Sequence, residues 1–166
     1  MGEQIRLRGW LAARKFNINC LGEYRNLGHF YQYDDRLHKF PQDEVFISDG
    51  ERISFLDGYV YNKKDFLCAE GYHDWQKSFS LSLEKDAKAC LKKLRGAFCG
   101  YSYEQLTGDI IIYTDQVSNK ALYYYADGDR WIISNCVGLI VRVLKANRVT
   151  CDFNPNAARY MLTYDR

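Results

Sequence analysis

The sequence of 166 residues lacks the features that mark several large protein classes. No apolar run approaches the roughly 20 residues of a membrane-spanning helix, and the opening residues MGEQIRLRGW have no apolar signal-peptide stretch. Only two prolines are present, and we find no internal repeat, low-complexity tract or linker-like segment. These absences predict a single globular domain over residues 1–166, in a cytoplasmic protein without a membrane partner.

Charge and metal-ligand patterns exclude further classes. The 23 basic and 21 acidic residues give a net charge of +2, and the basic residues are spread along the chain, so nucleic acid is not an expected partner. The six cysteines occur singly without a CxxC pair, and the three histidines are far apart in the sequence. We therefore expect mostly buried, reduced cysteines, ordinary partly buried histidines, no metal site and no cofactor.

What is present predicts an α+β fold. Alternating apolar residues indicate strands at 5–12 and 52–61, the second one broken by Asp57-Gly58. Helical spacing from Leu83 to Leu94 predicts a helix, with Ser82 as its N-cap.

The second half of the chain predicts a run of strands followed by a helix. Short β-rich segments separated by turn residues predict an antiparallel meander, with strands at 97–104, 109–115, 121–127 and 131–135. Residues 137–145 fit a strand or a helix, and Asn154-Pro155 predicts the start of a last helix. Strands and covering helices in this order are typical of an α+β fold.

Residues 94–135, LRGAFCGYSYEQLTGDIIIYTDQVSNKALYYYADGDRWIISN, match a spaced family motif. They resemble the segment LxGxFAFxxYDxxxGxLxxxRDxxGxKPLYY, a turn and FASE, of the class II (N-terminal-nucleophile, Ntn) glutamine amidotransferase domain that opens asparagine synthetases. DGYVYNKKDF at 57–66 resembles that family's NGEIYNxxEL, and 153–165 resembles its following helix. The match covers about two thirds of the chain, and its specific part is the register over 94–135. The residues in register are Leu94, Gly96, Phe98, Gly108, Asp115, Lys120, Leu122 and Tyr123.

The resemblance implies a four-layer αββα Ntn-hydrolase-like sandwich of antiparallel sheets. It also implies that residues 1–166 are a glutamine amidotransferase type 2-like domain, the N-terminal part of a longer asparagine synthetase-like protein. The sequence contains no SGGxDS loop, so the ATP-pyrophosphatase (synthetase) domain is expected elsewhere in the same protein or in another chain. Asp115, Lys120 and Tyr123 belong to a structural corner in the family, and we expect Asp115 and Lys120 to pair or to cap the turn.

The groups that the family uses for glutamine hydrolysis are altered. Its nucleophile is an N-terminal cysteine whose own amine is the base, and Ile5 stands in that place; Cys20 lies too far inside the chain to supply a free amine. Asp57-Gly58-Tyr59 replaces the oxyanion-stabilising Asn-Gly-Glu, and a carboxylate at 57 would repel an oxyanion.

Two further elements of the family site have no convincing counterpart. The acidic SDxE motif that holds the substrate amino group is missing, and Asp86 is a poor substitute by position. Arg36 and Arg52 are candidates for binding the substrate carboxylate, although an exposed structural arginine is the interpretation that we favour for both.

Three functions follow from this comparison. The first is a pseudoenzyme, a degenerate domain without glutaminase activity that serves as scaffold for an ATP-dependent amide-forming domain. The second is a module that binds glutamine or another small molecule in a remnant pocket around Arg36, Asp57, Gly58 and Tyr59. The third is an active glutamine amidotransferase with a rewired site. A homo-oligomer remains open for all three.

Overall fold

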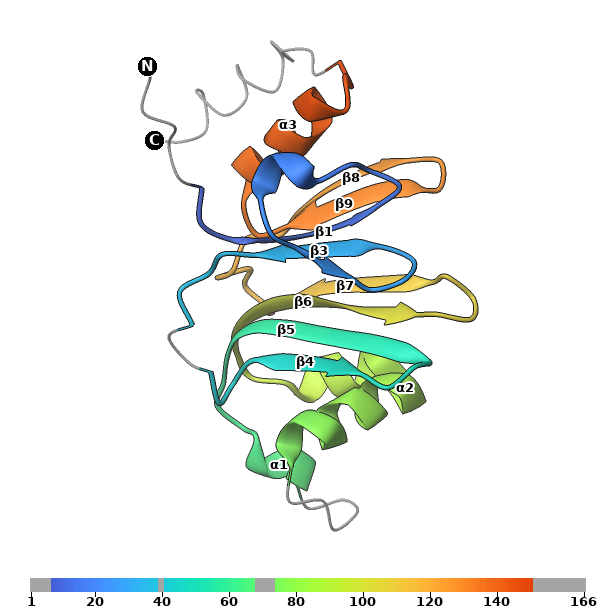
Figure 1. The fold of residues 1–166 in the computed structure, drawn as a ribbon. Helices are drawn as coiled ribbons and strands as arrows, with labels where there is room; N and C mark the ends of the chain where they lie inside the picture. The colour runs from blue at the N-terminus through green and yellow to red at the C-terminus, as the bar shows by residue number, and fades with distance from the viewer. Residues whose placement is uncertain (1–6, 39–40, 68–73, 151–166) are drawn as a thin grey trace.

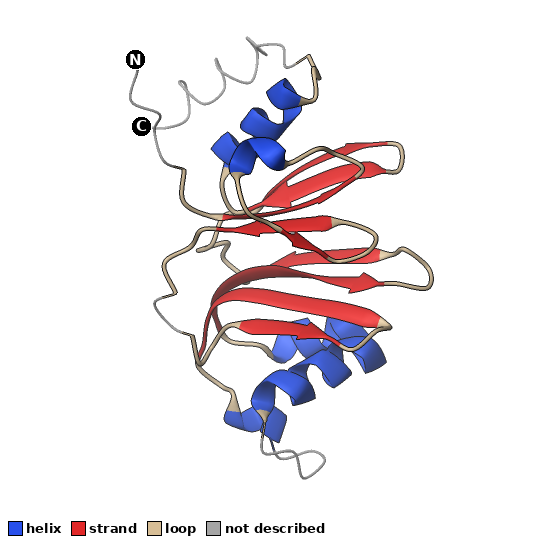
Figure 2. Ribbon diagram, in the orientation of Figure 1, coloured by secondary structure: helices blue, strands red, loops and turns tan. Residues whose placement is uncertain are grey.

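The computed structural model describes residues 7–38, 41–67 and 74–150. These residues form an α+β protein with two antiparallel sheets and three α-helices, as Figures 1 and 2 show. The five-stranded sheet has the order β2-β3-β1-β9-β8, and the four-stranded sheet has the order β4-β5-β6-β7. The predicted α+β class is thus confirmed.

The elements have the following bounds. The five-stranded sheet consists of β1 (Trp10–Arg14), β2 (Arg25–Asn26), β3 (Tyr31–Asp34), β8 (Tyr123–Asp127) and β9 (Arg130–Ser134). The four-stranded sheet consists of β4 (Val45–Ser48), β5 (Arg52–Val60), β6 (Gly96–Glu104) and β7 (Ile110–Thr114). The helices are α1 (Lys64–Leu67), α2 (Trp75–Lys93) and α3 (Val137–Ala146), with a short 3-10 turn, η1 (Asn19–Leu21).

Three hydrophobic clusters hold these elements together. One joins α2 to the four-stranded sheet, for example through Phe79 and Phe98. A second contains residues of both sheets, among them Trp10 of β1 and Phe55 of β5, whose rings meet edge to face with centroids 4.8 Å apart. The third joins α3 to the five-stranded sheet through residues such as Leu139 and Ile132. Alternation along each strand explains this division, since successive side chains point to opposite faces of a sheet.

Helix α2 is longer than the pattern predicted. It begins at Trp75 because Asp74 caps it, accepting a hydrogen bond from the Gln76 backbone N–H at 3.0 Å. Ser82, the predicted N-cap, lies inside the helix and donates its hydroxyl to the Ser78 carbonyl at 2.7 Å. The helix does break at Asp86, which has non-helical backbone angles and accepts from the Ala89 N–H. The predicted helix start at Ser82 was therefore wrong. Asp86, which caps the turn that follows it, marks a kink inside the helix.

The expected break in the strand at 52–61 was also wrong. β5 runs through Asp57-Gly58 without interruption, because it is paired on one side with β4 and along its whole length with β6. A side chain at Gly58 would meet the Ala97 carbonyl oxygen at 2.1 Å, so glycine here permits a close backbone approach rather than a turn.

The predicted meander is two hairpins in different sheets. β6 pairs with β7 in the four-stranded sheet, whereas β8 pairs with β9 in the five-stranded sheet. Residues 115–122 cross from one sheet to the other (Figure 1). Segment 137–145, which fitted either element, is helix α3, and the helix predicted after Asn154-Pro155 lies outside the described residues.

The first strand starts later than predicted, at Trp10 instead of residue 5. Gly9 lies against the end of β9, where an added Cβ would be 2.6 Å from Oδ1 of Asn135. Ile5 lies outside the described residues.

Within the described ranges, no helix is both long enough and apolar enough to span a bilayer.

Candidate functional site

A pocket of about 360 Å³ gathers most of the residues singled out by the sequence. We call it the Asp57 pocket. Another pocket, of about 330 Å³, lies along α1 and α2 and contains Asp86 but none of the other residues singled out by the sequence. The residues lining the Asp57 pocket are Arg8, Gly9, Arg36, Leu37, Glu44, Asp57, Gly58, Tyr59, Lys120 and Asn135.

Asp57 lies where the core between the sheets ends. It is paired with Cys99 of β6 and follows Phe55 on the same face of β5, so its side chain points between the two sheets. Only 6% of that side chain is exposed. A carboxylate so deeply buried needs charged or hydrogen-bonding partners.

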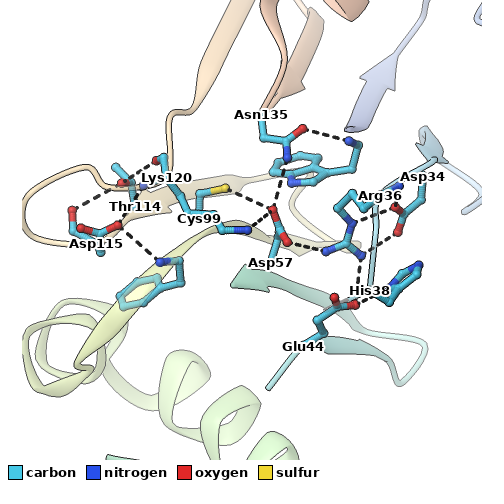
Figure 3. Close-up of polar contacts among 12 residues, drawn as sticks. Asp34, Arg36, His38, Glu44, Asp57, Cys99, Thr114, Asp115, Lys120 and Asn135 are labelled. Atoms are coloured by element: carbon cyan, nitrogen blue, oxygen red, sulfur yellow. Dashed lines mark hydrogen bonds and ion pairs between the residues drawn. The ribbon is translucent and has the colours of Figure 1, made fainter. Parts of the chain in front are cut away.

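Both oxygens of Asp57 have such partners (Figure 3). Oδ1 accepts from Nη1 of Arg36 at 2.8 Å. Oδ2 lies 3.1 Å from Nζ of Lys120 and accepts from Nδ2 of Asn135 at 3.3 Å. The carboxylate is therefore held by three groups from three different segments of the chain, and its charge is compensated.

Arg36 is the centre of the same network. Its Nε and Nη2 donate to the two oxygens of Asp34 at 2.8 and 2.7 Å, and Nη2 lies 3.4 Å from Oε2 of Glu44. The guanidinium carbon is 4.9 Å from the centre of the Phe55 ring, a cation–π arrangement. Burial would lower the pKa of Arg36, but the hydrogen bonds and charges of Asp34 and Asp57 outweigh it and raise the pKa. Arg36 is a fixed internal cation, and its predicted exposure was wrong.

Arg52, the other candidate for a carboxylate ligand, lies elsewhere. It is at the start of β5 and forms an ion pair with Glu104 of the neighbouring β6. It does not line the Asp57 pocket. The structure thus brings Arg36 to the pocket and leaves Arg52 at the start of β5. The Arg52 side chain is 18% exposed, so its predicted exposure was wrong too.

Asp115 fixes the segment that delivers Lys120. Its carboxylate accepts from the backbone N–H groups of Val117 and Asn119 at 3.1 Å and of Lys120 at 3.2 Å, and also from that of Phe98. Burial would raise the pKa of Asp115, but these amide hydrogen bonds outweigh it and lower the pKa. Asp115 caps the turn, as expected, whereas the ion-pair partner of Lys120 is Asp57.

Asn135 was not singled out by the sequence. Its side chain joins two elements: Oδ1 accepts from the Trp10 N–H at 2.9 Å while Nδ2 donates to Asp57. The only signal in the sequence is its place at the end of the predicted strand 131–135. Asp34 and Glu44 were missed for a similar reason, since neither belongs to a recognisable motif.

The other expected site residues differ in position and exposure. Tyr59 lines the pocket, and Tyr123 begins β8 with its side chain partly exposed. His38 is exposed and lies 2.7 Å from Glu44, and His29 is exposed too, so their predicted partial burial was wrong. Within residues 7–38, 41–67 and 74–150, no cluster of His, Cys, Asp and Glu has the arrangement of a metal site.

A thiol does lie beside Asp57, but in an unreactive state. Sγ of Cys99 is 4.0 Å from Oδ2 of Asp57. Burial and the neighbouring Asp57 charge raise the pKa of Cys99 to about 12. At neutral pH this thiol is protonated, and a protonated thiol is a weak nucleophile. Cys20 is exposed, near Arg142 of α3, and does not line the Asp57 pocket.

The arrangement can hold charges in fixed positions, and it contains no assembled nucleophile and base among the described residues. No protein-family model matches the sequence, and no curated protein matches it at a significant level.

Proposed function

We propose that the chain is a degenerate glutamine amidotransferase type 2-like domain that has lost glutaminase activity and serves as scaffold for an ATP-dependent, amide-forming synthetase domain. The proposal includes a four-layer αββα arrangement. In its support, α2 packs on the four-stranded sheet, α3 packs on the five-stranded sheet, and the two sheets share a core.

The observation that carries the proposal is the ion pair between Arg36 and Asp57. By the motif resemblance, position 57 would stabilise an oxyanion, and Arg36 is a candidate ligand for the substrate carboxylate. In this chain the two side chains bind each other at 2.8 Å. A glutamine carboxylate would have to compete with Asp57, and with Asp34 and Glu44, for the same guanidinium.

The state of the nearby groups supports the same conclusion. Ile5 stands where the motif requires a nucleophile, and an aliphatic side chain cannot attack an amide. A developing oxyanion beside Asp57 would meet a carboxylate instead of a donor. The Cys99 thiol next to it is buried and protonated. The residues at positions 5 and 57 each remove a separate catalytic contribution, and the Cys99 thiol does not replace the missing nucleophile.

The first test is a measurement of glutamate release from glutamine, together with calorimetric binding of glutamine. We expect no release above that of a heat-inactivated sample. Steady release would overturn the proposal in favour of a rewired amidotransferase, and the nucleophile would then be found by trapping it with an electrophilic glutamine analogue.

The scaffold role needs a second test, on the partner. The chain is used to capture interacting proteins, and the partner should carry the SGGxDS adenylation loop; its ATP–pyrophosphate exchange is then measured with and without this chain. We expect exchange to be faster or the partner more stable when the chain is bound. Equal exchange and equal thermal stability in both samples would contradict the scaffold role.

A small-molecule module is the second candidate, because the Asp57 pocket keeps a volume of about 360 Å³ after the chemistry is lost. The exposed Arg8 at its rim is not among the partners of Asp57. Binding of glutamine without turnover in the calorimeter would favour this function over a scaffold alone.

A further inference from the structure

A second pocket lies along α1 and α2, the helices on the outer face of the four-stranded sheet (Figure 1). We call this pocket of about 330 Å³ the α2 pocket. Asp65 and Phe66 of α1 line it, together with a row of α2 residues from Ser78 to Lys93. Because the residues of this row recur at every third or fourth position, they share one face of the helix. None of them lines the Asp57 pocket, so the two pockets are separate.

The floor of the α2 pocket is apolar. Phe66 and Cys90 belong to the hydrophobic core around α2 and are buried. Leu81 lines the same pocket and is 40% exposed, so apolar surface there is in contact with water. The volume is at the lower end of the range of ligand pockets, about 300–1,000 Å³. A pocket of this size and lining fits one small apolar group.

Segment 75–95 carries a surplus of positive charge. It has six basic and two acidic residues, a net charge of +4, whereas the whole chain has a net charge of +2. All six basic residues are exposed, and none belongs to an ion pair among the described residues. The helix dipole accounts for the two in the last turn of α2, Lys92 and Lys93, but not for the three cations before it. The six basic residues are Lys77, Lys85, Lys88, Lys92, Lys93 and Arg95.

Two of these cations, Lys85 and Lys93, line the α2 pocket itself. Burial raises the pKa of the Cys90 thiol to about 12, and the charge of Lys93 opposes this rise. The ammonium group of Lys93 is therefore close enough to act on the floor of the pocket. A cation beside an apolar floor attracts an anion that also carries an apolar part.

The two acidic residues of the lining already have hydrogen-bond donors. Asp65 accepts from Nδ2 of Asn62 at 2.8 Å. Asp86 accepts from the Ala89 backbone N–H at 2.9 Å. Among the charged side chains of the pocket, only the two lysines lack a hydrogen-bond partner within the described part of the chain. A ligand with an anionic group complements them.

We propose that the α2 pocket binds a small organic anion, a carboxylate or phosphate head on a short apolar body. Lys85 and Lys93 hold the head by charge-assisted hydrogen bonds, and the body lies against Phe66 and Leu81. A volume of about 330 Å³ is too small for the two acyl chains of a membrane lipid, so the ligand is a soluble molecule. This inference is independent of the proposed function, since it uses no residue of the Asp57 pocket.

The test is a titration with three probes, followed through the NMR chemical shifts of the backbone amides. Octyl phosphate carries head and body, inorganic phosphate carries the head alone, and octanol carries the body alone. We expect octyl phosphate to shift the amides of Ser82, Ala89 and Cys90. It should bind at least about tenfold more tightly than either half, because each half lacks the buried methylenes or the charged contacts. The amides of Gly58 and Asn135, in the Asp57 pocket, should not shift.

Two double variants separate the pocket from the general charge of the helix. K85Q/K93Q removes both lining cations and should raise the Kd of octyl phosphate at least about tenfold. K88Q/K92Q is the matched control, because it removes the same charge from exposed positions of α2 outside the pocket lining. It should change the Kd by less than about twofold, since exposed charges are screened. A89F, which fills the pocket without a change of charge, should abolish binding. Circular dichroism establishes that each variant is folded.

Four results would overturn the proposal. Amides of the α2 pocket that do not shift in millimolar octyl phosphate would show that the pocket takes no such anion. Equal weakening in the two double variants would assign binding to the overall charge of α2. Inorganic phosphate that binds as tightly as octyl phosphate would leave no role for the apolar floor. Co-sedimentation with phosphatidylserine vesicles, lost equally in both double variants, would make the helix a membrane-contact surface instead.

Discussion

Nη1 of Arg36 donates to Oδ1 of Asp57 at 2.8 Å, between side chains that are 7% and 6% exposed. The two residues are 21 positions apart in the sequence and come from the segment after β3 and from the middle of β5. Because each neutralises the other while both side chains are buried, removal of either leaves a buried charge without a full set of partners. The pair is therefore both a structural element and the reason why the pocket offers little to an external carboxylate.

We expect D57N to lower the free energy of unfolding by about 1–3 kcal/mol, since the amide keeps the shape of the carboxylate but loses its charge-assisted bonds to Arg36 and Lys120. Urea denaturation measures the loss. E44Q is the control, because Glu44 lies farther from Arg36, at 3.4 Å, and should cost less. Equal stability of D57N and wild type would show that the pair is not stabilising. Under the proposed function, D57N should also release no glutamate from glutamine, because the aliphatic side chain of Ile5 cannot act as a nucleophile.

R36M should be the more damaging change, with a loss of about 3–5 kcal/mol, because the buried carboxylates of Asp34 and Asp57 lose their shared cation. R36K should recover only part of this, since an ammonium cannot bridge Asp34 through two parallel bonds. R52M, which removes the more exposed pair with Glu104, whose side chains are 18% and 24% exposed, is the comparison and should cost about 0–1 kcal/mol. A deficit of R36M no larger than that of R52M would contradict the central role of Arg36.

Asp115 gives a prediction with a defined pH dependence. Its folded pKa is lowered, so the stability that it contributes is present above its unfolded pKa of about 3.9 and is lost as the pH falls through the lower folded value. D115N should therefore be less stable than wild type by about 2 kcal/mol near neutral pH, and the difference should narrow in acid. Thermal melts at several pH values test this. D109N, at an exposed position before β7, is the control for the loss of a carboxylate elsewhere. A pH-independent difference for D115N would refute the charged cap.

Local chemistry made part of this arrangement predictable. Asp115 sits beside a turn, and acidic residues there bind nearby backbone N–H groups, so its capping role followed from its immediate neighbours. The strands around Tyr101 and Ile132 were predictable because β-branched and aromatic residues alternate or cluster between turn residues.

The network around Asp57 was not predictable, because its contacts are long-range. Asn135 reaches Asp57 across 78 positions, and only the packing of the two sheets brings them together. Asp57-Gly58 reads locally as a turn, yet pairing with Cys99 and Phe98 of β6 keeps it in β5. The four strands of the second half look like one meander, and no local signal tells that residues 115–122 change sheets.

Three of the described cysteines, Cys20, Cys90 and Cys99, should differ strongly in reactivity. Burial raises the pKa of Cys90 and of Cys99 to about 12, whereas Cys20 is exposed, although partial burial raises its pKa too. Since only the accessible thiolate reacts with iodoacetamide, Cys20 should be labelled before Cys90 and Cys99 in the native protein. Cys90 and Cys99 should react only after denaturation. Peptide mapping by mass spectrometry resolves the three sites, and denatured protein serves as the control for full labelling. Early labelling of Cys99 would mean that the space beside Asp57 opens in solution and holds a usable thiolate, and it would count against the proposed loss of glutaminase activity.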